Sequence, residues 1–227
     1  MPHEAPTPAP KPRTRRRRAN VERILDAATD LAFEEGIDAL SMQRVADRAD
    51  YTAGALYRYF SSKDALLAAV VVRVIARLKA RVAAASADSP GPLQTIVAQA
   101  DAYRRFAAEE PHGYALVAHL VGDPRVLLQD ENDARAVMEA VVDALTPLAV
   151  ALQSATDAGA LAPGDVRERA LLLFTGLQGA LQLRKQQRMA PGLIDTDHMA
   201  RAMVRSLLAG WGAHADALEA AFRPLDA

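Results

Sequence analysis

The stretch from Ser41 to Phe60 constrains this chain more than any other part of its 227 residues. Ser41 is a favourable helix N-cap, and the apolar residues of Met42–Ala49 that follow it recur at helical spacing. After two residues that interrupt this pattern, Thr52 caps a second helix, which we predict over Ala53–Phe60. Two short helices separated by so tight a turn predict a helix-turn-helix.

The second of these helices begins with three small residues, Ala53, Gly54 and Ala55. Free backbone amides at a helix N-terminus bind anions, and side chains without bulk let those amides approach a partner closely. We therefore predict that this end of the helix enters a DNA groove, where Ala53 and Ala55 can also meet a thymine methyl group.

Polar side chains around the turn supply candidate DNA contacts of two kinds. Tyr57 and Lys63, with the two capping residues, are expected to contact phosphates, whereas Gln43, Arg44 and Arg58 carry donors that can read bases. Tyr59 can face either DNA or the core, because it follows an apolar Leu by three residues. Because the DNA-facing side of the helix-turn-helix has few long polar side chains, we expect DNA shape to contribute to discrimination between DNA sequences. The full set of candidate DNA-binding residues is Arg17, Arg18, Ser41, Gln43, Arg44, Thr52, Ala53, Gly54, Tyr57, Arg58, Tyr59 and Lys63.

Positive charge is concentrated in the same third of the chain. Residues 11–81 hold 15 Lys and Arg against 9 Asp and Glu, a net charge of +6, whereas residues 82–227 hold 12 against 18, a net charge of −6. This asymmetry would orient the molecule towards a polyanion by one end. Arg13 and Arg15–Arg18 form a basic run that can follow the DNA backbone or enter the minor groove, or can simply be a solvated tail. Because Met1–Pro12 carries five prolines and few large apolar residues, we predict that residues 1–18 form a disordered basic arm.

The segment GIDALSMQRVADRADYTAGALYRYFSSKDAL, residues 36–66, resembles the TetR family of bacterial transcriptional regulators. The resemblance covers Ala19 to about Ala69, and its most specific part is GALYRYFSSK, residues 54–63. Three residues depart from the usual pattern: Asp50 stands where glycine is commonest, Tyr51 replaces a small branched residue, and Ala55 replaces a threonine. The resemblance implies a phosphate contact at Lys63, a homodimer, and a helical core that binds a small molecule.

Breaks and caps divide the rest of the N-terminal part. We predict a first helix over Asn20–Glu35 that stops at Gly36, and a fourth over Ser62–Ala85 whose start Ser61 caps together with Asp64. The resemblance implies that this fourth helix transmits ligand-driven motion to the helix-turn-helix of residues 41–60, the DNA reader. The predicted organisation is a basic arm at residues 1–18, a helix-turn-helix domain at residues 19–61, and a ligand-binding and dimerisation domain at residues 62–227 that begins with the linking helix 62–85.

Beyond the break at Asp88–Pro92, the chain shows helical periodicity without sustained strand alternation. We predict helices over Pro92–Ala108 and Pro111–Gly122, a turn at residues 122–124, and a long helix over Asp130–Gly159 that Pro147 kinks. The predicted fold class is all-α, with an N-terminal three-helix DNA-binding domain of helix-turn-helix type and a C-terminal helical domain for ligand binding and dimerisation.

The last two predicted helices, Asp165–Arg188 and Asp197–Phe222, carry more apolar surface than a helix packed within a monomer needs. Their small residues would let two copies approach closely, giving a two-fold bundle of four helices. The competing interpretation is that these helices wrap a monomeric core. The candidate dimer-interface residues are Leu172, Gly176, Gly179, Leu183, Met203, Leu207, Gly210 and Trp211.

A small-molecule site is expected from the family resemblance. Aromatic walls with a few polar anchors are typical of ligand cavities, although each such residue can equally be plain core. The candidate ligand-binding residues are Tyr103, Phe106, His112, Tyr114, His119, Phe174, Gln178 and Gln182. The aromatic and apolar composition of the C-terminal region favours a hydrophobic effector.

Other kinds of chemistry find little support in the sequence. With no cysteine, the chain has neither a disulfide framework nor a cysteine-based metal site, and His112 and His119 lack the third ligand that zinc needs. We find no glycine-rich phosphate loop and no nucleophile elbow, so we expect neither an enzyme nor a cofactor. The longest uncharged run, Ala170–Leu183, has 14 residues, fewer than the roughly 18 that suggest a membrane span, and no signal peptide is recognisable. We therefore expect a cytoplasmic protein without a membrane partner.

These observations lead to one functional hypothesis and three alternatives. We predict a homodimeric repressor that binds a palindromic double-stranded operator and is released by a small hydrophobic effector. Within the same class, the alternative is an activator or a ligand-blind regulator. From different classes come a sequence-indifferent nucleoid-type DNA-binding protein and a helical module that binds or converts a small molecule.

Overall fold

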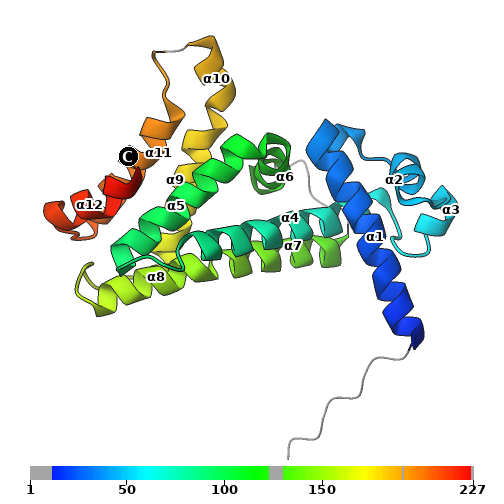
Figure 1. Ribbon diagram of the computed structural model, residues 1–227, viewed down its shortest axis with the longest axis horizontal. Helices are drawn as coiled ribbons and strands as arrows, with labels where there is room; N and C mark the ends of the chain where they lie inside the picture. Colours follow the sequence, from blue (N-terminus) through cyan, green and yellow to red (C-terminus); the bar gives the residue numbers. More distant parts are fainter. Residues whose placement is uncertain (1–11, 123–129, 191, 226–227) are drawn as a thin grey trace, which may run out of the picture.

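The protein is described by a computed structural model that covers residues 12–122, 130–190 and 192–225. Helices make up the secondary structure of these residues, and no strand is formed among them, which confirms the all-α prediction (Figure 1). The predicted disorder of residues 1–11 and the predicted turn after Gly122 lie outside the described residues.

The first helix, α1 (Pro12–Glu35), begins eight residues earlier than predicted. The basic run of Arg13 to Arg18 is therefore part of a helix, and the prediction of an irregular arm is wrong for these residues. Helix α1 ends where the chain turns at Gly36, whose φ of 88° lies in the left-handed region that glycine adopts without strain. A short 3-10 helix, η1 (Ile37–Ala39), leads from there to the next element.

The helix-turn-helix consists of α2 (Met42–Ala49) and α3 (Ala53–Leu56). Ser41 caps α2 by accepting a hydrogen bond from the Arg44 amide at 3.2 Å, and Thr52 caps α3 by accepting one from the Ala55 amide at 3.2 Å. Between them Asp50 takes a left-handed conformation with φ 60°, which Asp tolerates better than most residues. Both predicted caps are confirmed.

Helix α3 is shorter than the predicted Ala53–Phe60. After Leu56 the chain tightens into turns, in which the Tyr59 amide bonds the Leu56 carbonyl at 2.8 Å. The buried side chains of Leu56 and Phe60 belong to the same hydrophobic core as those of Val45 and Ile24, and α2 packs on both α1 and α3.

The long helix α4 (Lys63–Ala85) joins this core to the rest of the molecule. Its N-cap is Ser62, which accepts a hydrogen bond from the Ala65 amide at 3.0 Å, so the expectation that Ser61 caps it is wrong. Helix α4 packs on α1 at one end and on α5, α6 and α7 along its length. Arg73 forms ion pairs with Glu22, at 2.9 Å, and with Asp26, both on α1.

The middle of the chain forms α5 (Pro92–Glu109), α6 (Pro111–Gly122), α7 (Glu131–Ala144) and α8 (Thr146–Asp157). The predicted long helix is interrupted at Leu145, next to Pro147, which has no amide to donate to the helix. Helix α7 lies along α4, and α8 packs on α5 and α9 (Figure 1). By length and composition, the helical segment Glu131–Asp157 could cross a membrane. This is weak evidence for a membrane span, because core helices of soluble proteins pass the same test.

The C-terminal part contains four helices where two were predicted: α9 (Val166–Gln182), α10 (Arg184–Met189), α11 (Thr196–Gly210) and α12 (Ala215–Phe222), followed by η2 (Arg223–Leu225). Helix α11 ends because Gly212 has a φ of 97° and the Ala213 amide turns back to the Leu208 carbonyl at 3.0 Å. The prediction of two uninterrupted helices is therefore wrong. Helices α9 and α11 pack against each other.

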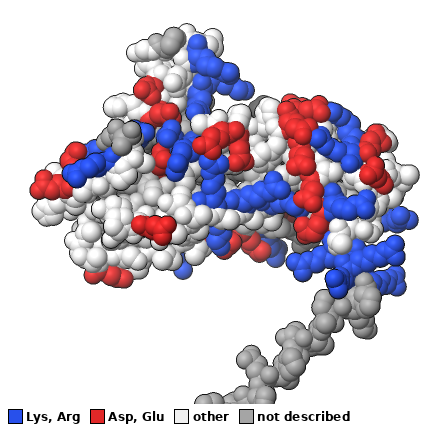
Figure 2. All heavy atoms as spheres, in the orientation of Figure 1, with Lys and Arg blue, Asp and Glu red and all other residues white. Residues whose placement is uncertain are grey.

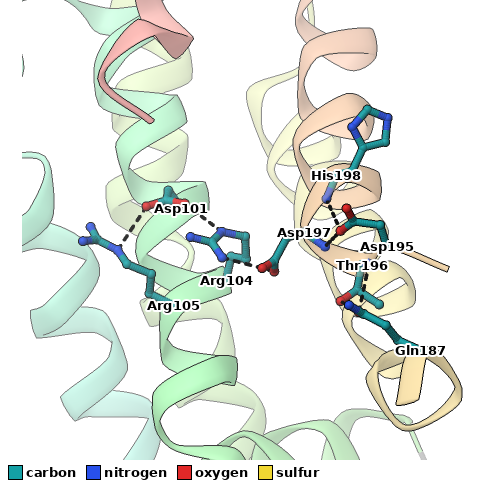
Figure 3. Close-up of polar contacts among 8 residues, drawn as sticks. All are labelled: Asp101, Arg104, Arg105, Gln187, Asp195, Thr196, Asp197 and His198. Carbon is teal, nitrogen blue, oxygen red and sulfur yellow. Dashed lines mark hydrogen bonds and ion pairs between the residues drawn. The ribbon is translucent and has the colours of Figure 1, made fainter. Parts of the chain in front are cut away.

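A polar network holds α11 in place (Figure 3). On α5, the side chain of Asp101 is only 5% exposed and accepts a hydrogen bond from Nε of Arg104 at 2.8 Å. Arg104 also pairs with Asp197 of α11 at 3.1 Å. On the other side, the Thr196 hydroxyl donates to Gln187 of α10 at 2.6 Å. These bonds fix α11 relative to both neighbouring helices.

Candidate nucleic-acid interface and ligand cavity

The N-terminal end of α3 is open. A Cβ added at Gly54 would meet no other atom within 4 Å, and Thr52 and Gly54 are both exposed. The first capped amide of α3 is that of Ala55, so the amides of Ala53 and Gly54 precede the hydrogen bonds of the helix. Such an end can approach a phosphate or a base edge closely.

Exposed side chains with free polar groups lie beside this end. Tyr57 is 53% exposed, and Arg58 and Lys63 are exposed as well. Within the part of the chain that the structure describes, neither Arg58 nor Lys63 forms an ion pair. Lys63 occupies the first turn of α4, where the helix dipole disfavours a cation, so an anionic partner would stabilise it there.

The two base-reading candidates on α2 are already engaged. Gln43 donates from Nε2 to Asp47 at 2.7 Å, and Arg44 pairs with Glu35 at 2.6 Å. The hydrogen bond from Arg44 is also the main cause that lowers the pKa of the Glu35 carboxyl. Either side chain would have to leave its partner before it could read a base, which leaves Arg58 as the free donor among the three.

Tyr59 lies against α1. Its hydroxyl accepts a hydrogen bond from Asn20 at 2.9 Å, and its ring meets that of Tyr51 edge-on at 6.1 Å. Arg17 stands 6.0 Å from the Tyr59 ring, and Arg23 stacks on Tyr51 at 5.0 Å while donating to the Ala49 carbonyl at 2.9 Å. Tyr51 therefore has a packing role in the turn, through contacts with Tyr59 and Arg23.

The start of α1 projects beyond the other helices of the reader (Figure 1). Arg17 and Arg18 are exposed there, together with the rest of the basic run. Figure 2 shows blue side chains gathered at this end of the molecule, next to a band of acidic residues. The acidic residues of α1 include Glu22 and Asp26, which pair with Arg73, so much of the negative charge is neutralised within the fold.

A cavity of about 70 Å³ lies in the C-terminal part. Of the candidate ligand residues, Tyr103 and Phe174 line it, with their rings edge-on at 6.0 Å. Its lining comes from α4, α5, α6, α7, α8 and α9, together with Leu145 between α7 and α8, and consists of Ile75, Leu78, Lys79, Val82, Gln99, Ala100, Tyr103, Val117, Val141, Ala144, Leu145, Leu148, Leu173, Phe174 and Leu177.

The remaining ligand candidates lie elsewhere. Phe106 is buried in the core, and His112 is exposed, with Nδ1 2.5 Å from the Phe33 carbonyl of α1. Tyr114 and Gln182 line a separate groove beside α10. Gln178 is buried next to Tyr103, and the side chain of His119 lies outside the described residues.

The phenols near the cavity are neutral groups. Tyr103 donates its hydroxyl proton to Oε1 of Gln178 at 2.5 Å, and burial raises the pKa of Tyr103 well above its ordinary value. Burial likewise raises the pKa of Tyr114 to about 12. Sequence reasoning missed Gln99 and Lys79 in this lining, because both are polar residues on helices with broad apolar faces. In the described ranges no group of His, Asp and Glu could hold a metal ion.

The candidate dimer residues divide into two sets. Leu172 is 44% exposed, and Gly179 and Gly210 are open to solvent on the outer side of α9 and α11. By contrast, a Cβ at Gly176 would lie 2.7 Å from the Met203 sulfur, so this pair belongs to the contact between the two helices of one chain. Trp211 stacks with Arg169 at 5.2 Å, and Leu183 and Leu207 are half-buried.

The fold and these features define a two-part helical protein with a DNA reader and a small-molecule cavity. A family model described as "Bacterial regulatory proteins, tetR family" matches residues 24–70, and one described as "Tetracyclin repressor-like, C-terminal domain" matches residues 96–207. The chain belongs to the TetR family of bacterial regulatory proteins.

Several known proteins are similar to this chain. The HTH-type transcriptional repressor KstR of Mycobacterium tuberculosis is 39% identical over 79 residues, which are 35% of this chain and 36% of KstR. The HTH-type transcriptional activator FasR of Mycolicibacterium smegmatis is 31% identical over 126 residues, 55% of this chain and 58% of FasR. The chain thus spans from about a third to somewhat over half the length of these curated relatives. The crystal structure of RolR in complex with resorcinol has a TM-score of 0.69 at 18% identity, and the match covers 93% of this chain and 97% of RolR.

Proposed function

We propose that this chain is a homodimeric transcriptional repressor that binds a palindromic operator and leaves it when a small apolar effector enters the cavity. The observation that carries the proposal is the open end of α3, flanked by the unpaired Arg58 and Lys63 and by the exposed Tyr57. A groove of duplex DNA supplies the phosphates and base edges that such a surface lacks within the chain. In this proposal the protein acts in the cytoplasm on double-stranded operator DNA and is not an enzyme.

The individual contacts follow from these positions. Ser41, Thr52, Tyr57 and Lys63 fix the register on phosphates, and Arg58 reads a base in the major groove. Gln43 and Arg44 contribute once phosphates and base edges of DNA replace Asp47 and Glu35 as their acceptors. Tyr59 positions α1, so that Arg17 and Arg18 reach the backbone beside the reader. Ala53 and Gly54 approach the groove floor.

The cavity is coupled to the reader through α4. Ile75, Leu78, Lys79 and Val82 of this helix line the cavity, and Lys63 at its other end lies in the proposed DNA surface. A ligand that displaces the cavity walls moves α4 as a rigid body, and α1 follows through the Arg73 ion pairs. An effector that favours one arrangement by about 1–3 kcal/mol changes operator affinity five- to 150-fold.

Dimerisation through the outer faces of α9 and α11 supplies the second reader. Exposed apolar and small residues, among them Leu172, Gly179 and Gly210, are available there for a second copy. Two readers related by a two-fold axis match two half-sites about one helical turn apart, or a small multiple of it.

Activation is the second candidate. FasR, with 31% identity over 55% of this chain, is named as an activator, whereas KstR is named as a repressor. The same DNA surface serves either outcome, because the sign of regulation depends on where the operator lies relative to the promoter. A transcription assay on the chain's own operator, with and without the protein, distinguishes the two.

The test begins with an operator obtained by selecting bound sequences from random DNA. Labelled operator is titrated with the full chain while unlabelled random DNA is present in excess. We expect Arg58→Ala to weaken the free energy of operator binding by about 1–3 kcal/mol and to relax the preference for one base pair. Lys63→Ala should weaken the binding of all DNA sequences alike. Lys185→Ala, at an exposed lysine of α10, is the matched control and should leave affinity unchanged.

Equal affinity for operator and random DNA would identify a sequence-indifferent DNA-binding protein and refute the operator proposal. If neither Lys63→Ala nor Tyr57→Ala weakens DNA binding, the assigned surface is wrong and the alternative of a helical small-molecule module gains support. A monomer at the concentration where operator binds would refute the two-fold arrangement.

A further inference from the structure

We propose that the effector is a neutral, largely apolar molecule carrying a hydroxyl or N–H group that donates a hydrogen bond to Oε1 of Gln99. This inference rests on the proposed role of the cavity as the effector site, and it specifies the chemical class that the cavity accepts. Carboxylates, ketones and ethers of the same size, which offer no proton, bind more weakly.

Gln99 is the polar residue that leads to this inference. It lies on α5, lines the cavity and is only 5% exposed. Its Nε2 donates to Oγ of Ser86 at 3.1 Å and to the Pro147 carbonyl at 3.5 Å. Its Oε1 is buried and has no hydrogen-bond partner among the described residues. Buried polar atoms without a partner are uncommon and costly, so a group that pairs with this oxygen gains from it.

The orientation of the amide follows from its neighbours. The Pro147 carbonyl only accepts hydrogen bonds, and the Ser86 hydroxyl lies within 3.3 Å of the Val82 carbonyl and 3.2 Å of the Ala83 carbonyl, to which it gives its single proton. Both partners of Gln99 therefore require a donor, and Nε2 is the atom that faces them. Rotating the amide would place Oε1 against two acceptors, so Oε1 is the group left for a ligand.

The other polar groups of the lining are already engaged within the chain. Tyr103 has committed its hydroxyl proton to Gln178, so it has no donor left for the ligand. Lys79 pairs with Asp143 of α7 at 2.7 Å, which neutralises its charge at the edge of the cavity. The rest of the lining is apolar. A ligand that presents an acceptor atom in place of a donor would face the acceptor Oε1 of Gln99, and Oε1 would remain without a hydrogen bond.

The cavity sets the size of suitable probes. Its volume of about 70 Å³ is several times the roughly 10–15 Å³ that a single water needs by the same measure. Small single-ring compounds are therefore the appropriate test set. Para-cresol carries a hydroxyl donor, para-methylanisole replaces it by an ether, para-toluate carries a carboxylate, and toluene has no polar group.

The experiment measures the affinity of the full chain for these four probes by calorimetry. We expect para-cresol to bind about tenfold or more tightly than para-methylanisole and toluene, as one buried hydrogen bond implies. Gln99→Met keeps the length of the side chain but removes the acceptor. In this variant the affinity for para-cresol should exceed that for para-methylanisole and toluene by about twofold or less. Gln94→Met, at a half-exposed position on the same helix outside the lining, should keep the full ratio.

The outcomes separate this inference from the proposed function. If all neutral probes bind equally and release operator DNA, the effector cavity stands and the role of Gln99 is refuted. If para-toluate binds most tightly, Lys79 determines the ligand class and the inference is wrong. If no probe binds, both the inference and the cavity as effector site are overturned. The comparison of probes on the wild-type chain needs no variant, so a variant that fails to fold does not remove the test.

Discussion

Helices α6 and α1 meet so closely at Gly113 that one added carbon must displace a neighbour. A Cβ at this position would lie 2.6 Å from Cζ of Phe33 on α1 and 3.3 Å from Cζ of Phe106. Carbon atoms in contact are normally about 3.5–4.0 Å apart, so the Phe33 ring must shift by roughly 1 Å. Phe106 is 2% exposed and has no room to recede. Overpacking of this kind costs about 1–3 kcal/mol, and we expect Gly113→Ala to lower the free energy of unfolding by that amount.

A double-mutant cycle measured by urea unfolding tests the cause of this loss. Phe33→Leu removes the ring atoms that a Cβ at Gly113 would meet, so the same alanine should cost less than about 0.5 kcal/mol in that background. The expected coupling between the two sites is therefore at least about 0.5 kcal/mol and reaches about 2.5 kcal/mol or more at the upper end of the range. Phe33→Leu alone serves as the control for the loss of the ring.

The same variant probes the link between the two parts of the molecule, because α1 braces the reader and α6 contributes Val117 to the cavity. We expect Gly113→Ala to weaken operator binding under conditions where the chain is still folded, and Phe33→Leu to restore it in the double variant. If the two substitutions are additive in stability, the steric contact does not exist as described. If stability couples but operator affinity does not change, the contact is structural only.

Three further predictions test other parts of the fold. Leu56→Ala, at a side chain with 0% exposure, should lower stability by about 2–5 kcal/mol and abolish operator binding, as followed by urea unfolding and by titration of labelled operator. Asp195→Ala removes the cap that accepts from the His198 amide at 2.9 Å and should cost about 1 kcal/mol in thermal unfolding, whereas Asp195→Asn should retain most of it. Burial raises the pKa of Tyr114 to about 12 from an ordinary value of 10.0, so its contribution to stability is fully present below pH 10 and is lost as the pH rises from there towards 12. Urea unfolding between these pH values should show this decline, and a Tyr114→Phe chain with an equally steep decline would contradict it.

Local signals in the sequence were sufficient for most of the fold. Ser41 and Thr52 marked the two reader helices because a capping oxygen is decided by neighbours three residues away. The start of α1 was not recoverable in the same way, because the basic run has no apolar face and its helix is a continuation of the packed segment that follows. The end of α3 was also missed, since the tightening after Leu56 depends on how Tyr59 meets Asn20 of α1.

The site was predicted less completely for a related reason. Arg44 has the chemistry of a base reader, but its pairing with Glu35 depends on the return of η1 and α2 towards α1. In the same way, helical periodicity placed Tyr103 and Phe174 on inward faces but could not show that Gln99 faces the same cavity. Which polar residue lines a cavity depends on where several distant helices converge, and a single sequence does not contain that information in its local pattern.

Under the proposed function, the length of α4 explains quantitatively how a ligand in a small cavity would control a large DNA surface. Ile75, the first of its cavity residues, follows Lys63 by 12 residues, which corresponds to about 18 Å along a helix with a rise of 1.5 Å per residue. If a ligand tilts α4 by about 5° around its cavity end, Lys63 moves by roughly 1.5 Å over that length. In a two-fold dimer the readers would separate by up to about 3 Å, close to the 3.4 Å rise of one base pair. Under the proposed function, a displacement of that size would take one reader out of register while the other stays bound, so operator affinity would fall although neither reader changes its own structure.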